Sequence, residues 1–398
     1  MWITTNQGQQ VRVAALAALK DTQGDALAAN SRLRRQFPEI QAADISAALD
    51  QATLSSVALD RYDIDATELL LTRDGLEQGT RPEVAKLRAQ HIAHSGAEIV
   101  IDMSAGLGFD VRAMLDTGVR VIAIERDPTT AAYLRINAPR AQVIDGDSVQ
   151  IIEDLLPQLG PHDVIFFDPA RRTGRRTLDG SRAHPERDPE RWSPSWSFVT
   201  SLAKRDVRVC AKVTPGFSPA LLPDSWSGIW TSMNRDGVEA MVCSWKDGAV
   251  RTARMIDETA VDFVGSGIDY PGSIPVSRYL HEPDVSLVNA QLLNDFCIKN
   301  HGLHRIDEDS TWLTSQEPLS HPMIRSYRVD AILPNDTKAL RKALIAREIG
   351  DITIKSKGMS INTDAMRREL KLPAGKPGTI IIAIANKARV TLLVHHNG

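Results

Sequence analysis

The sequence predicts an α/β protein with a Rossmann-like core, and two observations carry this prediction. First, short apolar runs alternate with segments of helical periodicity between residue 97 and about residue 247. Second, a glycine-rich turn, SAGLG at 104–108, follows the first apolar run and precedes a helical pattern. Such alternation implies parallel strands whose sheet is covered by helices on both faces.

The core is expected to contain five parallel strands and a terminal hairpin. The strands are expected at Glu98–Asp102, Arg120–Glu125, Gln142–Ile144, Asp163–Phe167 and Val207–Val213, and the helices at 107–116, 128–137, 148–157 and 193–204. Two further strands, within SGIWTSMN and EAMVCSWKDG, are expected to pair antiparallel across a turn at Asp236-Gly237. The predicted fold is therefore a parallel sheet that ends in an antiparallel hairpin.

The regions on either side of the core have different patterns. Residues 1 to about 95 repeat Leu, Ala and Val at helical spacing, and residues 249–325 are weakly patterned with one helix around 285–298. In the last region we expect strands at SYRVDAIL and DITIKS, helices at 336–347 and 363–370, and a hairpin across Asn386-Lys387. We therefore expect four domains: helical (1–96), Rossmann-like (97–248), a small α+β, ferredoxin-like linker (249–325) and α+β (326–398).

Composition excludes several classes of protein. The chain has 398 residues, 42% hydrophobic and 24% charged, with a net charge of -3, so any nucleic-acid surface must be local. Its three cysteines form no CxxC pair, which argues against a disulfide framework or a zinc site, so no metal is expected. Arg12 interrupts the one apolar stretch near the start, so no signal peptide is expected. No apolar run approaches the roughly 20 residues that span a bilayer, so no membrane span is expected. These features favour a cytosolic, cytoplasmic protein.

The glycine turn is the first candidate for ligand binding. Gly106 and Gly108 let the backbone approach a ligand, and the helix that follows begins with unpaired N–H groups. A dinucleotide fingerprint needs a third glycine, but Val111 stands there and Asp110 puts a carboxylate where a pyrophosphate would lie. A nicotinamide dehydrogenase is therefore disfavoured. Asp102, at the tip of the first strand, instead favours a cationic ligand end, such as the amino group and sulfonium of S-adenosylmethionine.

Two further strands end in acids. Glu125 ends the second strand, where it can accept hydrogen bonds from two ribose hydroxyls, although it could also be an acid at the start of the helix at Pro128. Asp145 and Asp147 follow the third strand and can accept from the adenine amino group, although Asp147 could N-cap the next helix. Acids at three successive strand ends favour a ligand with several donors and no phosphates.

With these motifs together, the sequence resembles the class I S-adenosylmethionine-dependent methyltransferases. D-x-x-A-G-x-G-x-D at 102–110, E-R-D at 125–127, G-D-S at 146–148 and FFDPARR at 166–172 resemble motifs I to IV of that family. The whole chain also resembles a bacterial group with a C-terminal THUMP-like domain, through GLEQGTRPEVAKLRA, AKVTPGF, YLHEPDVSLVNAQLL and the segment 340–370. The resemblance implies an RNA methyltransferase acting on tRNA or rRNA, with residues 326–398 as the THUMP-like domain.

The resemblance also implies which residues hold the cofactor. The motif positions in this sequence are Asp102, Ala105, Gly106, Gly108, Asp110, Glu125, Arg126, Asp147, Ser148, Asp168 and Pro169. Gln78 and Thr80 precede the core at positions where such enzymes often contact the methionine end of the cofactor. Thr80 is at least as well suited to cap the helix that begins near Pro82.

The DPAR segment after the fourth strand is expected beside the transferable methyl group. Asp168 is expected to orient the acceptor or accept its proton, helped by Arg171 or Lys212. Ala170 and Arg171 replace the second proline and the aromatic residue of amino-methylating relatives, which disfavours methylation of a base amine. Methylation of uracil carbon 5 needs a cysteine nucleophile, and we expect Cys210 to be a core thiol. Lys212 could instead anchor a phosphate or be a strand-end lysine that reaches solvent.

Two basic regions are candidates for RNA binding. The arginine-rich loop at 170–192 includes Trp192, which could stack on a base, and the alternative is a solvated mobile loop. Basic residues also outnumber acids over 338–389, where the alternative is a solvated charged face. We therefore predict an RNA methyltransferase. The alternatives are a methyltransferase that acts on a small molecule or a protein, and an RNA-binding adaptor without catalysis.

Overall fold

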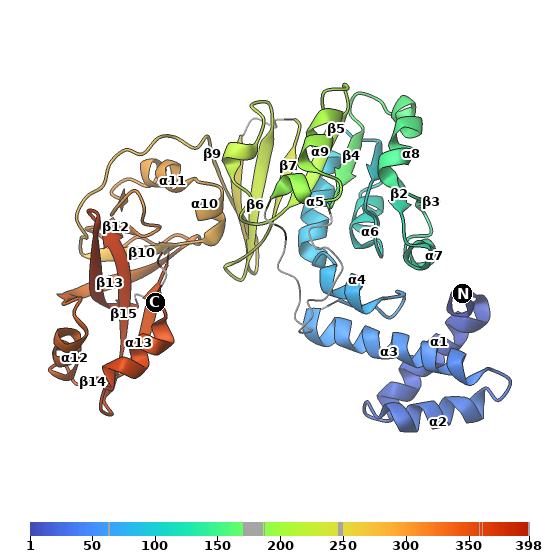
Figure 1. The fold of residues 1–398 in the computed structure, drawn as a ribbon, viewed down its shortest axis with the longest axis horizontal. Helices are drawn as coiled ribbons and strands as arrows, with labels where there is room; N and C mark the ends of the chain where they lie inside the picture. Colours follow the sequence, from blue (N-terminus) through green and yellow to red (C-terminus); the bar gives the residue numbers. More distant parts are fainter. Residues whose placement is uncertain are drawn as a thin grey trace. The chain divides into compact units, whose positions relative to one another are not determined.

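The computed structural model describes residues 1–62, 64–169, 186, 188–245, 250–357, 359 and 361–396, and it has the predicted α/β architecture. The chain divides into two compact units (Figure 1). The first unit is Met1–Lys212 with Cys243–Trp245, and the second is Val213–Val242 with Lys246–Gly398. Among the described residues, no helix is both long and apolar enough to cross a membrane.

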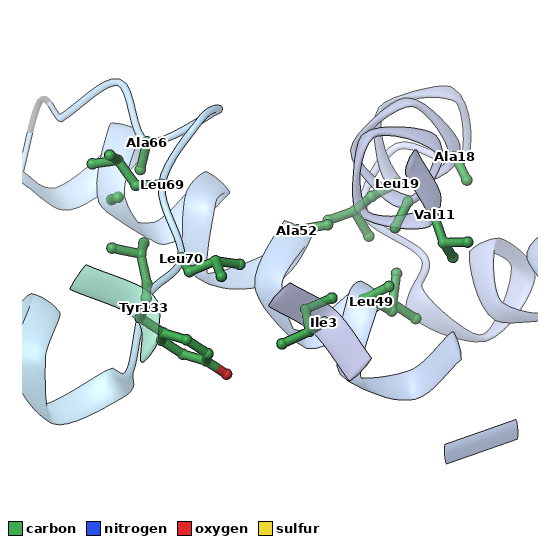
Figure 2. Packing of buried hydrophobic residues seen from close by; sticks show 14 of the residues in the cluster. Ile3, Val11, Ala18, Leu19, Leu49, Ala52, Ala66, Leu69, Leu70 and Tyr133 are labelled. Atoms are coloured by element: carbon green, nitrogen blue, oxygen red, sulfur yellow. The ribbon is translucent and has the colours of Figure 1, made fainter. Parts of the chain in front are cut away.

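The first part of the chain is helical, as predicted. After a short 3-10 turn, η1 (Trp2–Thr4), come the helices α1 (Asn6–Asp21), α2 (Ala26–Gln36), α3 (Ala42–Tyr62), α4 (Arg73–Gln78) and α5 (Pro82–His94). Figure 2 shows Ile3, Val11 and Leu49 in the apolar core of these helices. The same cluster extends to Leu70 and Tyr133, so the helical region packs directly onto the core that follows it.

A nine-stranded sheet has the order β3-β2-β1-β4-β5-β7-β6-β8-β9. Its strands are β1 (Ile99–Asp102), β2 (Arg120–Glu125), β3 (Gln142–Asp145), β4 (Val164–Phe167), β5 (Arg208–Val213), β6 (Ser227–Met233), β7 (Asp236–Cys243), β8 (Arg251–Ile256) and β9 (Ala260–Gly265). The first five strands pair in parallel. The helices between them are α6 (Phe109–Asp116), α7 (Pro128–Asn137), α8 (Ser148–Leu155) and α9 (Trp196–Leu202), with 3-10 turns η2 (Leu156–Gln158) and η3 (Pro189–Arg191). A further 3-10 turn, η4 (Pro219–Leu221), follows β5.

The end of this sheet differs from the sequence prediction in two ways. The turn between β6 and β7 lies at Asn234-Arg235, where both residues have positive φ (51° and 67°), and not at Asp236-Gly237. That backbone is the one a two-residue hairpin requires, and asparagine adopts it readily. Strands β8 and β9, which we did not predict, extend the sheet beyond the hairpin.

The second sheet has seven strands in the order β11-β12-β10-β13-β16-β15-β14. They are β10 (Tyr279–Pro283), β11 (His304–Arg305), β12 (Leu313–Ser315), β13 (Ile324–Leu333), β14 (Ile349–Ser356), β15 (Lys376–Ala385) and β16 (Ala388–His396). Helices α12 (Thr337–Ile345) and α13 (Thr363–Leu370) bury Leu340, Leu344, Met366 and Leu370 in one core with β14 and β15. The predicted turn at Asn386-Lys387 is confirmed, because both residues have positive φ.

Residues 249–325 are divided between the two sheets, since β8 and β9 belong to the first and β10, β11 and β12 to the second. The single helix expected around 285–298 is two helices, α10 (Val285–Asn289) and α11 (Leu293–Lys299). Gln291 between them has a φ of 54°, which ends the helical path of the chain. The four predicted domains remain a prediction about how the chain is organised.

Candidate functional site

The candidate site lies in the first unit, at the carboxyl edge of its parallel strands. Asp102 ends β1, Glu125 ends β2 and Asp168 directly follows β4. Because β2, β1 and β4 are parallel neighbours, their carboxyl ends meet at one edge of the sheet. Ligands of open α/β sheets bind at that edge, so the sequence motifs converge where this fold binds its ligands.

The glycine turn at this edge requires its glycines. Gly106 has a φ of 53° and Gly108 a φ of 88°, which side chains disfavour. A Cβ on Gly108 would lie 2.5 Å from the Leu134 side chain, whereas one on Gly106 would meet nothing closer than 4.0 Å. The Gly106 N–H donates to Glu125 Oε2 at 3.0 Å. Gly108 therefore allows α6 and α7 to pack closely, and Gly106 leaves open space above a turn that Glu125 holds.

Asp102 is a buried carboxylic acid, 1% exposed, beside this turn. Burial raises its pKa to about 8, although the Ser104 N–H donates to its Oδ1 at 2.9 Å and lowers that pKa. Asp110 and Asp168 raise the pKa further, and Arg88 lowers it. A carboxylate that is costly to bury without a partner is stabilised by a cation, so this position fits the cationic amino group of S-adenosylmethionine.

The acids of β2 and β3 have structural partners of their own. Both oxygens of Glu125 accept backbone hydrogen bonds, Oε2 from Gly106 and Oε1 from Asp127 at 2.8 Å. The N-cap of α7 is Asp127, and the N–H of Asp127 is held by Glu125. Asp147 N-caps α8 by accepting from the Val149 N–H at 2.9 Å, as one of the alternatives stated. Asp147 keeps a second carboxylate oxygen that can accept from a ligand.

A chain of hydrogen bonds crosses the site from β4 to α6. The Lys212 ammonium donates to Asp168 Oδ2 at 2.6 Å and to the Thr80 hydroxyl at 2.9 Å. The Thr80 hydroxyl in turn donates to Asp110 Oδ2 at 2.7 Å. Asp110 Oδ1 accepts from Arg88 in an ion pair. Lys212 is thus a buried cation on two acceptors, and not a strand-end lysine that reaches solvent.

The other predicted site residues take no part in these hydrogen bonds or lie outside the described residues. Arg126 and Gln78 are exposed, Ala105 and Pro169 are buried, Ser148 begins α8, and Arg171 with the loop segment 170–185 lies outside the described residues. The N-cap of α5 is Arg81, so the capping role considered for Thr80 is wrong. Trp192 is buried and its Nε1 donates to the Glu186 carbonyl at 3.0 Å, so it does not offer a face for base stacking.

Two residues of the site were not predicted. Ser104 accepts the Asp168 N–H at 2.7 Å through its hydroxyl, and its own N–H donates to Asp102. Arg88 lies in the apolar stripe of α5, four residues from both Val84 and Ile92. An arginine at core spacing in a helix needs a buried acid nearby, and that pattern was the available signal. Cys210 is a buried free thiol, as expected.

The described part of the chain contains no group of three or more His, Cys, Asp or Glu side chains arranged to hold a metal ion.

Comparison with known proteins also points to S-adenosylmethionine as the ligand of this fold. Residues 324–396 match the family described as THUMP domain-like. Over 326 residues, 80% of this chain and 86% of the other, the sequence is 27% identical to an uncharacterized S-adenosylmethionine-dependent methyltransferase of Mycobacterium tuberculosis strain H37Rv. Over 132 residues it is 30% identical to the ribosomal RNA small subunit methyltransferase J of Alkalilimnicola ehrlichii, of which it covers 50%.

The fold is similar to a crystal structure from Porphyromonas gingivalis W83, described as a candidate methyltransferase. The TM-score is 0.71 and the identity 21%, and the match covers 90% of this chain and 92% of that one. The order of the first sheet and the acid that ends β1 agree with these similarities. The chain is an S-adenosylmethionine-dependent methyltransferase with a class I core and a C-terminal THUMP-like domain.

Proposed function

We propose that this methyltransferase modifies a structured RNA, either tRNA or rRNA. The observation that carries the proposal is the charge on two neighbouring helices of the C-terminal sheet, α12 and α13. Their apolar sides are buried against β14 and β15. Their outer sides, with the turns that follow them, expose Lys338, Arg341, Lys342, Arg347, Arg368 and Lys371. Exposed cations gathered on one module of a protein with a net charge of -3 suit a phosphate backbone.

The relatives give independent support for an RNA substrate. The similar protein of Alkalilimnicola ehrlichii is named as a ribosomal RNA methyltransferase, and another, from Sorangium cellulosum, is named as ribosomal RNA large subunit methyltransferase E. The second similarity, 29% over 89 residues, covers 40% of that protein. Both similarities cover only part of this chain. The proposal of an RNA substrate therefore also rests on the charge of the C-terminal module.

We assign the cofactor contacts by chemistry. Asp102 would accept from the cationic amino group of S-adenosylmethionine, and the backbone of Gly106 would border its ribose. Glu125 would accept from the ribose hydroxyls, and the second carboxylate oxygen of Asp147 would accept from the adenine amino group. When bound, S-adenosylmethionine would supply a methyl group on a positively charged sulfur, and that sulfur would keep the electron pair of the bond to the methyl group. Within the described residues, the carboxylates of Asp102, Glu125 and Asp147 each keep a lone pair for a further hydrogen bond.

We assign to Asp168 the role of binding the group that accepts the methyl. Its side chain is 26% accessible, so that group can reach it. Its Oδ2 is held by Lys212, and its Oδ1 can accept a hydrogen bond from the acceptor group and take its proton. Its backbone N–H donates to Ser104, which fixes the residue at the end of β4. Catalysis is then mainly positioning of the acceptor in line with the methyl group.

The test is transfer of labelled methyl from S-adenosylmethionine into separated tRNA, rRNA and ribosomal subunits from a strain that lacks this gene. We expect label in one RNA class, and its loss in Asp168→Ala protein that still binds S-adenosylhomocysteine. If protein that binds the cofactor product labels none of these substrates, the RNA proposal is wrong, and a small molecule or a protein becomes the acceptor to seek. If Asp168→Ala turns over unchanged, Asp168 has no part in the mechanism.

A further inference from the structure

Arg88 is a charged residue inside the core of the first unit. It lies on α5 among the buried residues Val84, Ala85, Ala89 and Ile92, and its own side chain is 1% exposed. Its guanidinium forms an ion pair with Asp110, whose side chain is 12% exposed. Removing two charges from water costs much of what their attraction returns, so a buried pair is weak evidence of a stabilising role. The role of the ion pair is therefore inferred from the hydrogen bonds that Asp110 makes.

That geometry concerns the direction of one hydroxyl proton. Asp110 accepts from Arg88 through Oδ1 and from the Thr80 hydroxyl through Oδ2. A hydroxyl has a single proton, so once Thr80 donates to Asp110, its lone pairs are left for another donor. That donor is Lys212, whose Nζ lies 2.9 Å from the Thr80 oxygen and 2.6 Å from Asp168 Oδ2. Positive and negative side chains therefore alternate along this series of hydrogen bonds from Arg88 to Asp168, with the neutral Thr80 hydroxyl between Asp110 and Lys212.

We propose that Arg88 is a positioning residue for methyl transfer: by holding Asp110, it orients the Thr80 hydroxyl so that the hydroxyl accepts from Lys212 and keeps the ammonium on Asp168. The proposal rests on the role proposed above for Asp168. Without Arg88, Asp110 loses its cationic partner and its carboxylate is free to turn away. Thr80 then rotates, and Lys212 loses one of the acceptors that fix its position.

The kinetic test is a double-mutant cycle between Arg88 and Thr80. We expect Arg88→Met to lower kcat by about tenfold to a hundredfold with little change in KM for S-adenosylmethionine, the order expected for a misplaced catalytic group. Thr80→Val should lower kcat to a similar extent, and the double variant should be no slower than Thr80→Val alone. Arg88→Lys, which keeps the charge, should recover part of the lost rate. Multiplicative losses in the double variant would show that Arg88 does not act through Thr80.

The matched control is Arg12, a second buried arginine of the same unit. Its guanidinium donates to Gln9 and to the Thr67 carbonyl, away from the site. Arg12→Met should lower the melting temperature without lowering the kcat of the folded protein. If it lowers kcat as Arg88→Met does, loss of packing explains both and the inference is wrong. Should Arg88→Met not fold, Asp110→Asn serves in its place, because it keeps the shape of the side chain and removes its charge.

A measurement without RNA separates this inference from the proposed function. Lys212 is 7% exposed, so acetic anhydride should modify it slowly in the native protein. We expect modification of Lys212, followed by mass spectrometry, to be several-fold faster in Arg88→Met and unchanged in Arg12→Met. Absence of methyl transfer to RNA by the native protein would overturn the proposed function but leave this difference in place. Equal labelling of Lys212 in the native and Arg88→Met proteins would overturn the inference.

Discussion

The charges of the candidate site and those of the C-terminal module differ in how they are held. In the site, Asp102 is 1% exposed, and Lys212 contacts both Asp168 and Thr80. On α12 and α13, residues such as Lys338 and Lys342 are exposed and carry no ion pair within the described part of the chain. The first group has fixed positions in a low-dielectric setting, and the second is screened by solvent.

The difference indicates what each region can do. A buried, partnered charge has one geometry, so it can orient a reacting group, and replacing it leaves another charge without its partner. An exposed cation can follow a phosphate wherever it lies, so its contribution is interchangeable and depends on salt. We therefore expect substitutions in the site to act on kcat or cofactor affinity, and substitutions on α12 and α13 to act on RNA affinity.

The largest effect is expected at Lys212. Lys212→Met removes the cation that holds Asp168 Oδ2, so kcat should fall by about a hundredfold or more, within the range for loss of a proton-transfer group. Affinity for S-adenosylhomocysteine should be nearly unchanged. Lys204→Met, at an exposed lysine of the same unit, should retain full activity. Equal rates in the two variants would mean that the buried Lys212 matters no more to the reaction than an exposed lysine.

The second-largest effect is expected for substitution of Asp102, and it concerns cofactor affinity. Asp102→Asn removes the buried carboxylate proposed to pair with the cofactor amino group, so the dissociation constant for S-adenosylhomocysteine should rise about tenfold or more, as for a charged hydrogen bond. Isothermal titration calorimetry measures it. Asp163→Asn, at a buried acid that holds the Glu98 and Ile99 N–H groups instead, should leave the dissociation constant unchanged.

The same substitution should alter how stability depends on pH. In the folded protein the pKa of Asp102 is about 8, against an ordinary value of 3.8. Between these values the folded state holds a proton that the unfolded state has lost, so the free energy of unfolding falls as pH rises, by up to about 1.4 kcal/mol per unit. Asp102→Asn should remove this fall, which urea unfolding of the ligand-free protein at pH 5 to 8 measures. A slope that persists in the variant would assign the dependence to another group.

A smaller effect is expected on α12 and α13. Neutralising Lys338, Lys342 and Arg368 together to Gln should raise KM for RNA by about tenfold and leave kcat at saturating RNA unchanged. The plot of log affinity against log salt should lose a slope of about 2, close to 0.7 for each phosphate contact. The charge-preserving control exchanges Lys for Arg and Arg for Lys at the same positions and should bind as the native protein does. An unchanged slope in the Gln variant would mean that RNA binds elsewhere.

The smallest effect is expected for an exposed ion pair of the same module. Lys376 and Glu348 pair with 71% and 72% of their side chains accessible, so Lys376→Gln should leave the melting temperature within about 1 °C.

Glu282, which Lys355 and Lys357 hold in a buried position, provides the contrast to this exposed pair. Burial alone would raise the pKa of Glu282, but those hydrogen bonds lower it to about 2. Glu282→Gln should therefore lower the melting temperature clearly.

Local patterns were sufficient for much of the architecture. The strand over Arg120–Glu125 and the helix over Pro128–Asn137 have the predicted bounds, because apolar periodicity, Asp127 as N-cap and Pro128 act over short distances. The turn at Asn234-Arg235 was missed because the type of turn follows from the register of the two strands, which depends on the rest of the sheet. Strands β8 and β9 have short sequences that mix polar and apolar residues, and their pairing with β6 and with each other makes them strands.

By itself, the sequence determined the fold class, the glycine turn and the acids at the strand ends, since each depends on neighbouring residues alone. Only the tertiary structure decided what those acids and the basic residues contact. Thr80, Arg88 and Asp110 are joined to Lys212 across as many as 132 positions of sequence. Hydrogen bonds between such distant residues depend on how helices pack on the sheet, which no local pattern encodes.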